Sequence, residues 1–163
     1  MKTLVVGDLH LKQQFVLPRI DEMLAGDAEI GRVVFLGDAC DDWGANEADE
    51  LNAMEFYAKW VREHRGRGMR VDVLLGNHDF CYVRGKRGPG SIMSIMRNLR
   101  TILEDALQAK VACAVGPYLC SHAGVTGVWA KRFLADVPAD AVSIAQRLNE
   151  MLADSSHWGD LDS

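Results

Sequence analysis

Short apolar runs alternate along the chain with longer stretches in which apolar residues recur every three or four positions. The short runs are rich in β-branched and leucine side chains, which is typical of strands buried on both faces of a sheet. The first three end at a glycine followed by Asp or Asn, and the last two flank Gly116-Pro117, which predicts a turn. The predicted strands are Leu4–Val6, Arg32–Leu36, Val71–Leu75, Val111–Val115 and Tyr118–Cys120.

The longer stretches predict helices, because spacings of three and four residues place their apolar side chains on one face. Glycines follow the first two of these stretches, as is common at helix ends. The predicted helices are Pro18–Leu24, Glu47–Arg65, Ser91–Leu107 and residues 139–152. Phe80–Gly90 is basic and rich in glycine, and the polar tail from Asp154 to Ser163 lacks periodicity, so neither predicts a regular element.

Strands that alternate with helices predict an α/β fold with a mostly parallel sheet. At 163 residues, 48% of them hydrophobic and 25% charged, the chain fits one globular domain over residues 1–163. A formal net charge of -5 argues against non-specific nucleic-acid binding, so we expect no stable nucleic-acid partner.

No apolar stretch reaches the length of a membrane span, so we expect no membrane association. The apolar run that begins the chain stops at Gly7, too early for the core of a signal peptide, and reads better as a first strand. The four cysteines form no CxxC pair and show no zinc-site spacing. Reduced thiols in a cytoplasmic protein are the expected state.

Four polar blocks follow the predicted strands. Ligands of open α/β sheets bind at the carboxyl ends of the strands, so these blocks are expected to meet there. Their Asp, Asn and His side chains offer oxygen and imidazole ligands, which suit a two-metal hydrolytic site. The blocks are Gly7-Asp8-Leu9-His10, Gly37-Asp38 with Asp41, Gly76-Asn77-His78-Asp79, and Ser121-His122-Ala123-Gly124.

The spacing within the blocks predicts distinct roles. Asp8 and His10 are two residues apart on an extended segment, so their side chains point the same way and can share one metal. Asp38 can bridge two metals because a carboxylate has several lone pairs. Asn77 offers a neutral oxygen and His122 an imidazole nitrogen.

His78 directly follows Asn77, and adjacent side chains on a turn diverge. It is therefore better placed to protonate a leaving oxygen than to bind metal. Asp41 can orient that imidazole and raise its pKa, as carboxylate partners of histidine do. The alternative for Asp41 is a structural role as a turn or helix N-cap residue.

These motifs resemble the calcineurin-like metallophosphoesterase superfamily, whose pattern is D-x-H, G-D-x-x-D and G-N-H-[DE], followed by later histidines. The Ser121–Gly124 block is most similar to bacterial and bacteriophage members of the serine/threonine phosphoprotein phosphatase branch. The resemblance implies a four-layer fold of two packed sheets flanked by helices. It also implies a dinuclear centre of Mn, Fe, Zn or Ni and direct attack of a metal-bound hydroxide.

Carried onto matching positions, the resemblance implies two ligand sets that share Asp38. Asp8, His10 and Asp38 would hold the first metal, and Asp38, Asn77 and His122 the second. His78 with Asp41 would form the acid pair. The implied activity is phosphomonoester hydrolysis of a phosphorylated small molecule, nucleotide or phosphoprotein. The alternatives are a phosphodiesterase or nuclease, or a metal-binding module that has lost turnover.

Two departures from the family pattern concern the substrate and the metals. Phosphoprotein phosphatases carry a phosphate-binding Arg where this chain has Asp42. The family's Gly-His block is absent, so we expect a fragment or a C-terminally shortened relative. His157, the one histidine after His122, either supplies the missing ligand or has a surface or packing role.

Without an arginine at position 42, the basic loop Phe80–Gly90, which follows the block that contains His78, has the nearest cations in sequence. Arg84 and Arg87 are candidate substrate-binding residues, because a guanidinium binds phosphate in a bidentate manner. Glycine-rich basic loops often close over substrates, which predicts a mobile loop at Phe80–Gly90. Simple solvation of these cations is the alternative.

Overall fold

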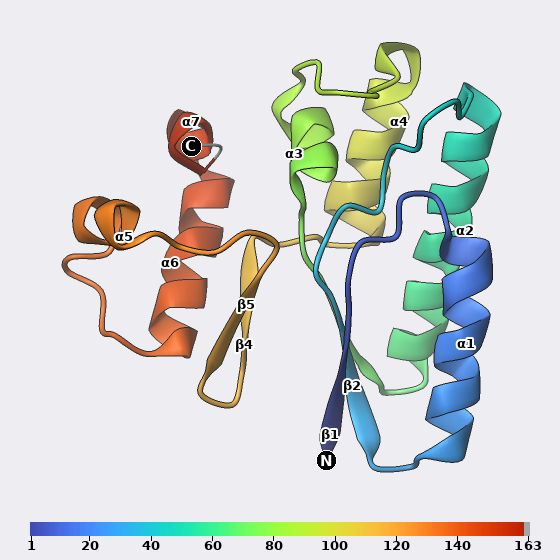
Figure 1. Ribbon diagram of the computed structural model, residues 1–163, viewed down its shortest axis with the longest axis horizontal. Helices are drawn as coiled ribbons and strands as arrows, with labels where there is room; N and C mark the ends of the chain where they lie inside the picture. Colours follow the sequence, from blue (N-terminus) through green and yellow to red (C-terminus); the bar gives the residue numbers. More distant parts are fainter. Residues whose placement is uncertain (162–163) are drawn as a thin grey trace.

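The computed structural model describes residues 1–161 and has a parallel sheet at its centre (Figure 1). The sheet contains β1 (Lys2–Val6), β2 (Ile30–Phe35) and β3 (Arg70–Val73) in that order. Val6 pairs with Phe35, which also pairs with Val73, so the three strands end at the same level. This register brings the polar segments that follow each strand to one edge of the sheet.

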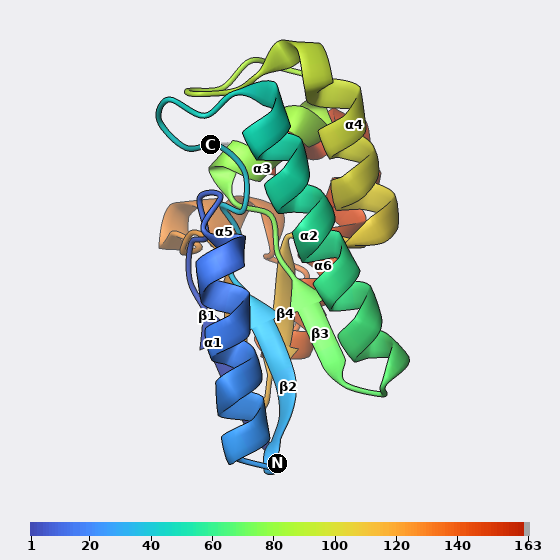
Figure 2. The same cartoon turned by 90° about the vertical axis from the view of Figure 1, so that its right-hand side faces the viewer.

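Helices α1 (Gln13–Gly26) and α2 (Glu47–Gly66) lie together along one face of this sheet (Figures 1 and 2). The ring of Phe35 contacts those of Tyr57 and Trp60 edge to face, with centroids 5.0 and 5.7 Å apart. The predicted apolar stripe of α2 thus forms much of the main core. Asn46 caps this helix by accepting hydrogen bonds from the backbone of its first turn.

The first helix begins earlier than its sequence pattern predicts. Pro18 lies inside α1 and not in its first turn, because the helix already begins at Gln13. The Gln13 side chain is buried, and its amide donates to the Ala39 carbonyl at 2.8 Å. This tertiary bond at the first helical residue links α1 to the loop after β2.

The prediction of no regular element over Phe80–Gly90 is wrong for its first half. Residues from the predicted turn form α3 (Asn77–Arg84), which ends at Gly85 in the left-handed conformation. Asp79 caps it, since its carboxylate accepts from the Gly76 backbone. The predicted helix at Ser91–Leu107 is instead a succession of η1 (Met93–Ile95), α4 (Met96–Thr101) and the π-helical η2 (Ile102–Ala106).

An antiparallel hairpin packs on the other face of the parallel sheet. It consists of β4 (Ala112–Val115) and β5 (Tyr118–Ser121). Cys113 of the hairpin is buried against Val34 and Leu74 of the sheet. Helix α6 (Ala141–Ala153) covers the side of the hairpin that faces away from the parallel sheet, as Figure 1 shows, with Ala145 and Leu148 buried against Ala112.

The last part of the chain contains helices that the sequence pattern did not predict. They are α5 (Gly127–Phe133), η3 (Ser155–His157) and α7 (Trp158–Leu161). The tail from Asp154 was expected to lack regular structure, and this is wrong as far as Leu161; residues 162–163 lie outside the described part. In the stretch 1–161, no helix is both long and apolar enough to cross a bilayer.

Candidate active site

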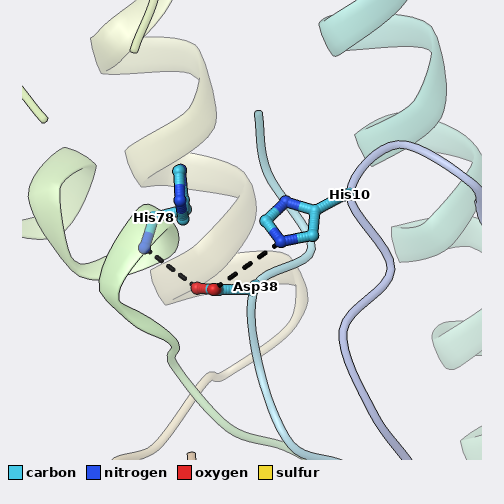
Figure 3. Close-up of side chains that lie close together, drawn as sticks. All are labelled: His10, Asp38 and His78. Carbon is cyan, nitrogen blue, oxygen red and sulfur yellow. Dashed lines mark hydrogen bonds and ion pairs between the residues drawn. The ribbon is translucent and has the colours of Figure 1, made fainter. Parts of the chain in front are cut away.

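The polar blocks meet at the carboxyl edge of the parallel sheet. His10, Asp38 and His78 converge there from the segments after β1, β2 and β3 (Figure 3). The rings of His10 and His78 lie edge to face with centroids 5.0 Å apart. His122 joins them from the segment after β5. The expected meeting of the four blocks is therefore present.

Two of the block glycines are required because their backbones touch. A Cβ on Gly37 would lie 2.3 Å from the Gly76 nitrogen, and Gly37 also has a φ of +110°. A Cβ on Gly76 would lie 2.0 Å from Oδ1 of Asp38. Gly7 has neither constraint, since its φ is not positive and, apart from its chain neighbours, no described residue has a heavy atom within 4 Å of its Cβ position. Of these three glycines, Gly37 alone therefore has the left-handed backbone conformation that favours glycine.

Three site residues adopt left-handed backbone conformations, which are unfavourable for residues other than glycine. The φ values are 38° for His10, 50° for Asp38 and 64° for Asp41. The backbone nitrogens of Leu9 and His10 both donate to the Asp38 carbonyl, at 3.0 and 2.9 Å, and hold the first two blocks together. Such conformations persist where the surrounding contacts over-determine them, and they cluster at functional sites.

Asp79 joins two of the blocks from a buried position. Its carboxylate accepts from the backbone nitrogens of Ala39 and Cys40, each at 3.0 Å, and of Gly76 at 2.9 Å. Its side chain therefore satisfies three N–H groups that the loops would otherwise bury unpaired. This last residue of the third block shapes the site and does not line it.

Asp38 lies at the centre of the candidate metal ligands, and only 4% of its surface is exposed. Its Oδ1 accepts from the His78 backbone nitrogen at 2.9 Å. Its Oδ2 faces Nε2 of His10 at 3.8 Å and Nε2 of His122 at 3.4 Å. The same carboxylate oxygen therefore faces both imidazoles.

The other ring nitrogens define the tautomers of these two histidines. Nδ1 of His10 lies 2.8 Å from the Asp41 carbonyl oxygen, and Nδ1 of His122 lies 3.2 Å from that of Leu36. Carbonyl oxygens accept only, so both Nδ1 atoms donate. In the neutral rings each Nε2 then carries the lone pair that a metal requires.

The chemistry of this donor set fits a divalent cation. Oδ1 of Asn77 lies 3.1 Å from Nε2 of His122, which also faces the Asp38 carboxylate. These atoms are all acceptors when the imidazole is neutral, so their convergence needs a proton or a cation between them. Carboxylate, amide oxygen and imidazole suit Mn, Fe and Zn.

Two groups of ligand atoms, each within 4.8 Å of one another, share Asp38. One combines Asp38 with His10 and His78, and the other combines it with Asp8 and His122. The structure thus brings Asp8 close to His122, with Oδ1 of Asp8 3.8 Å from Nδ1, whereas the sequence pattern paired it with His10.

Charge near His10 affects its proton affinity. Burial lowers the pKa of the His10 imidazole, but its bond to the Asp41 carbonyl and the negative charge of Asp38 outweigh this effect. The pKa therefore lies above its ordinary value. A protein surrounding that favours positive charge at this point also favours a cation there.

The acid pair expected from the sequence is in contact. Nδ1 of His78 lies 3.1 Å from Oδ2 of Asp41, which is 3% exposed. Two further buried residues hold Asp41: Tyr82 donates to its Oδ1 at 2.5 Å, and Glu50 accepts from its backbone nitrogen at 3.1 Å. Burial raises the pKa of Glu50 to about 7.

Sequence reasoning missed both supporting residues. Glu50 had a signal, because it shares the apolar stripe of α2 with Met54, Tyr57 and Val61 and is fully buried. A carboxylate on a buried stripe needs a polar partner, which points to a site. Tyr82 had no signal, because the helix that presents it was not predicted.

The candidate substrate-binding arginines follow His78 of the acid pair in the sequence. Arg84 is on α3, with its guanidinium 5.6 Å from the Phe80 ring centroid, and Arg87 is exposed in the loop that follows. That loop reaches the acid pair at Gly90, where a Cβ would lie 3.5 Å from Cβ of Asp41. The structure therefore brings the end of the loop to the site.

Asp42 and His157 have partners outside the ligand cluster. Asp42, which replaces the arginine of the phosphoprotein phosphatases, forms an ion pair with Lys12. His157 lies in η3 with Nδ1 3.3 Å from Asp160. Among the described residues, the groups that could hold a metal do not include His157.

A cavity of about 300 Å³ adjoins the ligand cluster. Asn77 and His122 are among its lining residues, together with apolar side chains such as Phe80 and Trp129. Within residues 1–161, no charged side chain contributes to its wall. The cavity is therefore suited to an uncharged organic group next to the polar site.

A protein-family model covers almost the whole chain. The model of the calcineurin-like phosphoesterases matches residues 1–161. The chain belongs to that family. Its α/β fold is consistent with a metallophosphoesterase domain, and the family is typically metal-dependent. A comparison with curated proteins finds no match.

Solved structures support the same fold. A crystal structure of a mutant cold-active protein tyrosine phosphatase is similar, with a TM-score of 0.59 and 16% sequence identity. The alignment covers 99% of this chain and 49% of that chain, so this chain spans about half the length of the phosphatase. At this identity the likeness concerns the fold alone.

Proposed function

We propose that this protein hydrolyses phosphate monoesters with two divalent ions held around Asp38. The observation that carries the proposal is the buried Oδ2 of Asp38, which faces imidazole nitrogens of both His10 and His122. A buried carboxylate shared by two sets of donor atoms suits a bridging ligand. Asp8 and Asn77 supply further oxygen ligands beside His122.

When bound, two divalent ions supply an activated water and neutralise the charge that develops on the phosphate. The chain itself orients the ligands and moves the proton. His10 and His122 are held by backbone carbonyls, so their Nε2 lone pairs keep one direction. His78 donates Nδ1–H to Asp41, and its Nε2 is the atom that delivers a proton to the leaving oxygen.

We further infer the finer classification from the Ser121–Gly124 block. It supports membership of the bacterial and bacteriophage branch of serine/threonine phosphatase-type enzymes. The order of helices, parallel sheet, hairpin and α6 seen in Figure 1 supports the four-layer arrangement of that family. The metals that the donor set supports are Mn, Fe, Zn and Ni.

The cavity beside the site favours a monoester over a polynucleotide. Its uncharged wall suits the organic part of a small phosphate ester, whereas a nucleic-acid backbone needs a row of cations. A phosphodiesterase would instead have to accommodate an ester group on each side of the phosphate.

The experiment that tests the function measures turnover of an aryl phosphate monoester and its diester counterpart after loading with Mn, Zn or Fe. We expect metal-dependent hydrolysis of the monoester at least about ten times faster than that of the diester. Asp38→Asn is the inactive control. Asp42→Asn removes the same charge outside the ligand cluster and should stay active. Faster diester cleavage would overturn the assignment, and metal binding without any turnover would identify a binding module.

A further inference from the structure

Tyr82 lies one helical turn after His78 on α3 and is fully buried. The two side chains contact the same carboxylate: Tyr82 donates to Oδ1 of Asp41 at 2.5 Å, and Nδ1 of His78 lies 3.1 Å from Oδ2. Each carboxylate oxygen therefore has its own donor. Asp41 thus joins two side chains of one helix at positions i and i+4.

The direction of the Tyr82 hydrogen bond follows from its surroundings. The backbone nitrogen of Ile92 donates to Oη at 3.0 Å, so the phenol already accepts one hydrogen bond. Its own proton then points to Asp41, which can only accept. Burial and the bond to Asp41 raise the pKa of Tyr82, so the phenol stays protonated and remains a donor at neutral pH.

Asp41 needs such support because its backbone conformation is unfavourable, with a left-handed φ of 64°. Its nitrogen is held by a hydrogen bond to Glu50, and its carboxylate by Tyr82. Without the phenol, Oδ1 would be a buried carboxylate oxygen without its donor, and the carboxylate could rotate away from His78 to find another. Loss of one partner in a buried network weakens the remaining bonds.

We infer that Tyr82 is a positioning residue, which acts through Asp41 to hold the His78 imidazole toward the leaving oxygen. The inference rests on the proposed phosphomonoesterase function. Tyr82 also connects the acid pair to the loop that ends at Ile92, since its Oη bonds to both. It does not touch the reacting atoms, so its effect depends on how much the leaving group needs a proton.

That dependence gives a test that a purely structural role would not satisfy. Dinitrophenyl phosphate releases dinitrophenolate, which is a stable anion, whereas ethyl phosphate needs a proton on its leaving oxygen. We expect Tyr82→Phe to lower kcat for ethyl phosphate about tenfold, a part of the about 10²–10⁴-fold that acid catalysis supplies. The kcat for dinitrophenyl phosphate should change less than about twofold.

Tyr57→Phe is the matched control. Tyr57 is also fully buried, but its Oη has no hydrogen-bond partner among the described residues. We expect Tyr57→Phe to leave kcat for both substrates unchanged. In an Asp41→Asn background, Tyr82→Phe should add no further substrate dependence. An equal loss on both substrates, or no loss on either, would overturn the positioning role.

A measurement without turnover separates this inference from the proposed function. NMR of the metal-free protein with ¹⁵N-labelled histidine reports the Nδ1–H of His78, assigned with His78→Gln. We expect Tyr82→Phe to shift this signal and speed its exchange with water, and Tyr57→Phe to leave it unchanged. An unchanged signal in Tyr82→Phe overturns the inference even if the enzyme is active. If the wild type hydrolyses neither substrate, the function fails, whatever the signal shows.

Discussion

Gly76 lies so close to Asp38 that a methyl group on it would come within 2.0 Å of the carboxylate oxygen Oδ1 and 2.4 Å of the Asp38 nitrogen. The loops after β2 and β3 therefore touch through backbone atoms. This contact holds Asp38 beneath the imidazoles, because its carboxylate cannot move toward Gly76 and its Oδ1 is bound to the His78 nitrogen.

Gly76→Ala should therefore destabilise the fold and weaken metal binding. The added methyl group must displace either Asp38 or the β3 loop, and overpacking of this kind costs up to about 3 kcal/mol. Denaturant unfolding measures the free energy, and calorimetry the metal affinity. Gly7→Ala is the matched control at the corresponding position of the first block, where the space is open. Similar stability of both variants would contradict the close contact.

Asp38→Asn should release both metals. An amide keeps the size of the side chain but loses the negative charge that both imidazole groups face. We expect metal affinity to fall by more than the about 100-fold produced by losing an outer-shell partner. Metal analysis after gel filtration measures the content, with Asp42→Asn as the control. A variant that still held two ions per chain would exclude Asp38 as the bridging ligand.

His78→Ala should lower turnover and leave the metals in place. Its Nδ1 is engaged by Asp41, so the imidazole serves proton transfer, and the expected loss is about 10²–10⁴-fold on an alkyl phosphate. Metal content is measured on the same samples. His157→Ala is the control, because that ring bonds to Asp160. Full activity on a poor leaving group, or loss of a metal, would show that the role is different.

Glu50 should make stability depend on pH near neutrality. Its pKa rises from the ordinary 4.5 to about 7 on folding, so the folded protein binds this proton more tightly than the unfolded chain. The stability that the proton contributes is complete below pH 4.5 and is lost as the pH rises through about 7. The change follows about 1.4 kcal/mol per unit of pKa difference.

Glu50→Gln removes this titration and keeps an acceptor oxygen for the Asp41 nitrogen. Unfolding free energies of both proteins between pH 5 and about 8 test the prediction. We expect the wild type to lose stability relative to Glu50→Gln as the pH increases. Glu55→Gln, on the exposed side of the same helix, should follow the wild type. A constant difference between wild type and Glu50→Gln would disprove the shift.

Arg84→Ala and Arg87→Ala should raise KM for phosphorylated substrates more than they lower kcat. Loss of binding that is common to the ground and transition states has this kinetic signature. Arg132→Ala is the matched control, because its guanidinium lies over Phe133 as that of Arg84 lies over Phe80. Steady-state kinetics on an aryl phosphate and a nucleotide give the two constants. Unchanged KM in both variants would mean that these two cations do not bind the phosphate of the substrate.

The strands and the polar residues that end them could be predicted from the sequence alone. A continuous apolar run requires burial, and Asp, Asn or His directly after it can lie only at the strand end. Because the carboxyl ends of parallel strands share one edge, His10, Asp38 and Asn77 were expected to meet. The glycine beside Asp38 belongs to the same local pattern.

Tertiary structure alone decided how these residues are paired and supported. Asp8 lies beside His122 because the hairpin packs on one face of the parallel sheet, and no local spacing encodes that contact. The helix at Asn77–Arg84 forms because Asp79 caps it and ties it to the loop after β2. Tyr82 and Glu50 then reach Asp41 across 41 and 9 residues of chain, and such long-range hydrogen bonds become favourable only once the core has excluded water from them.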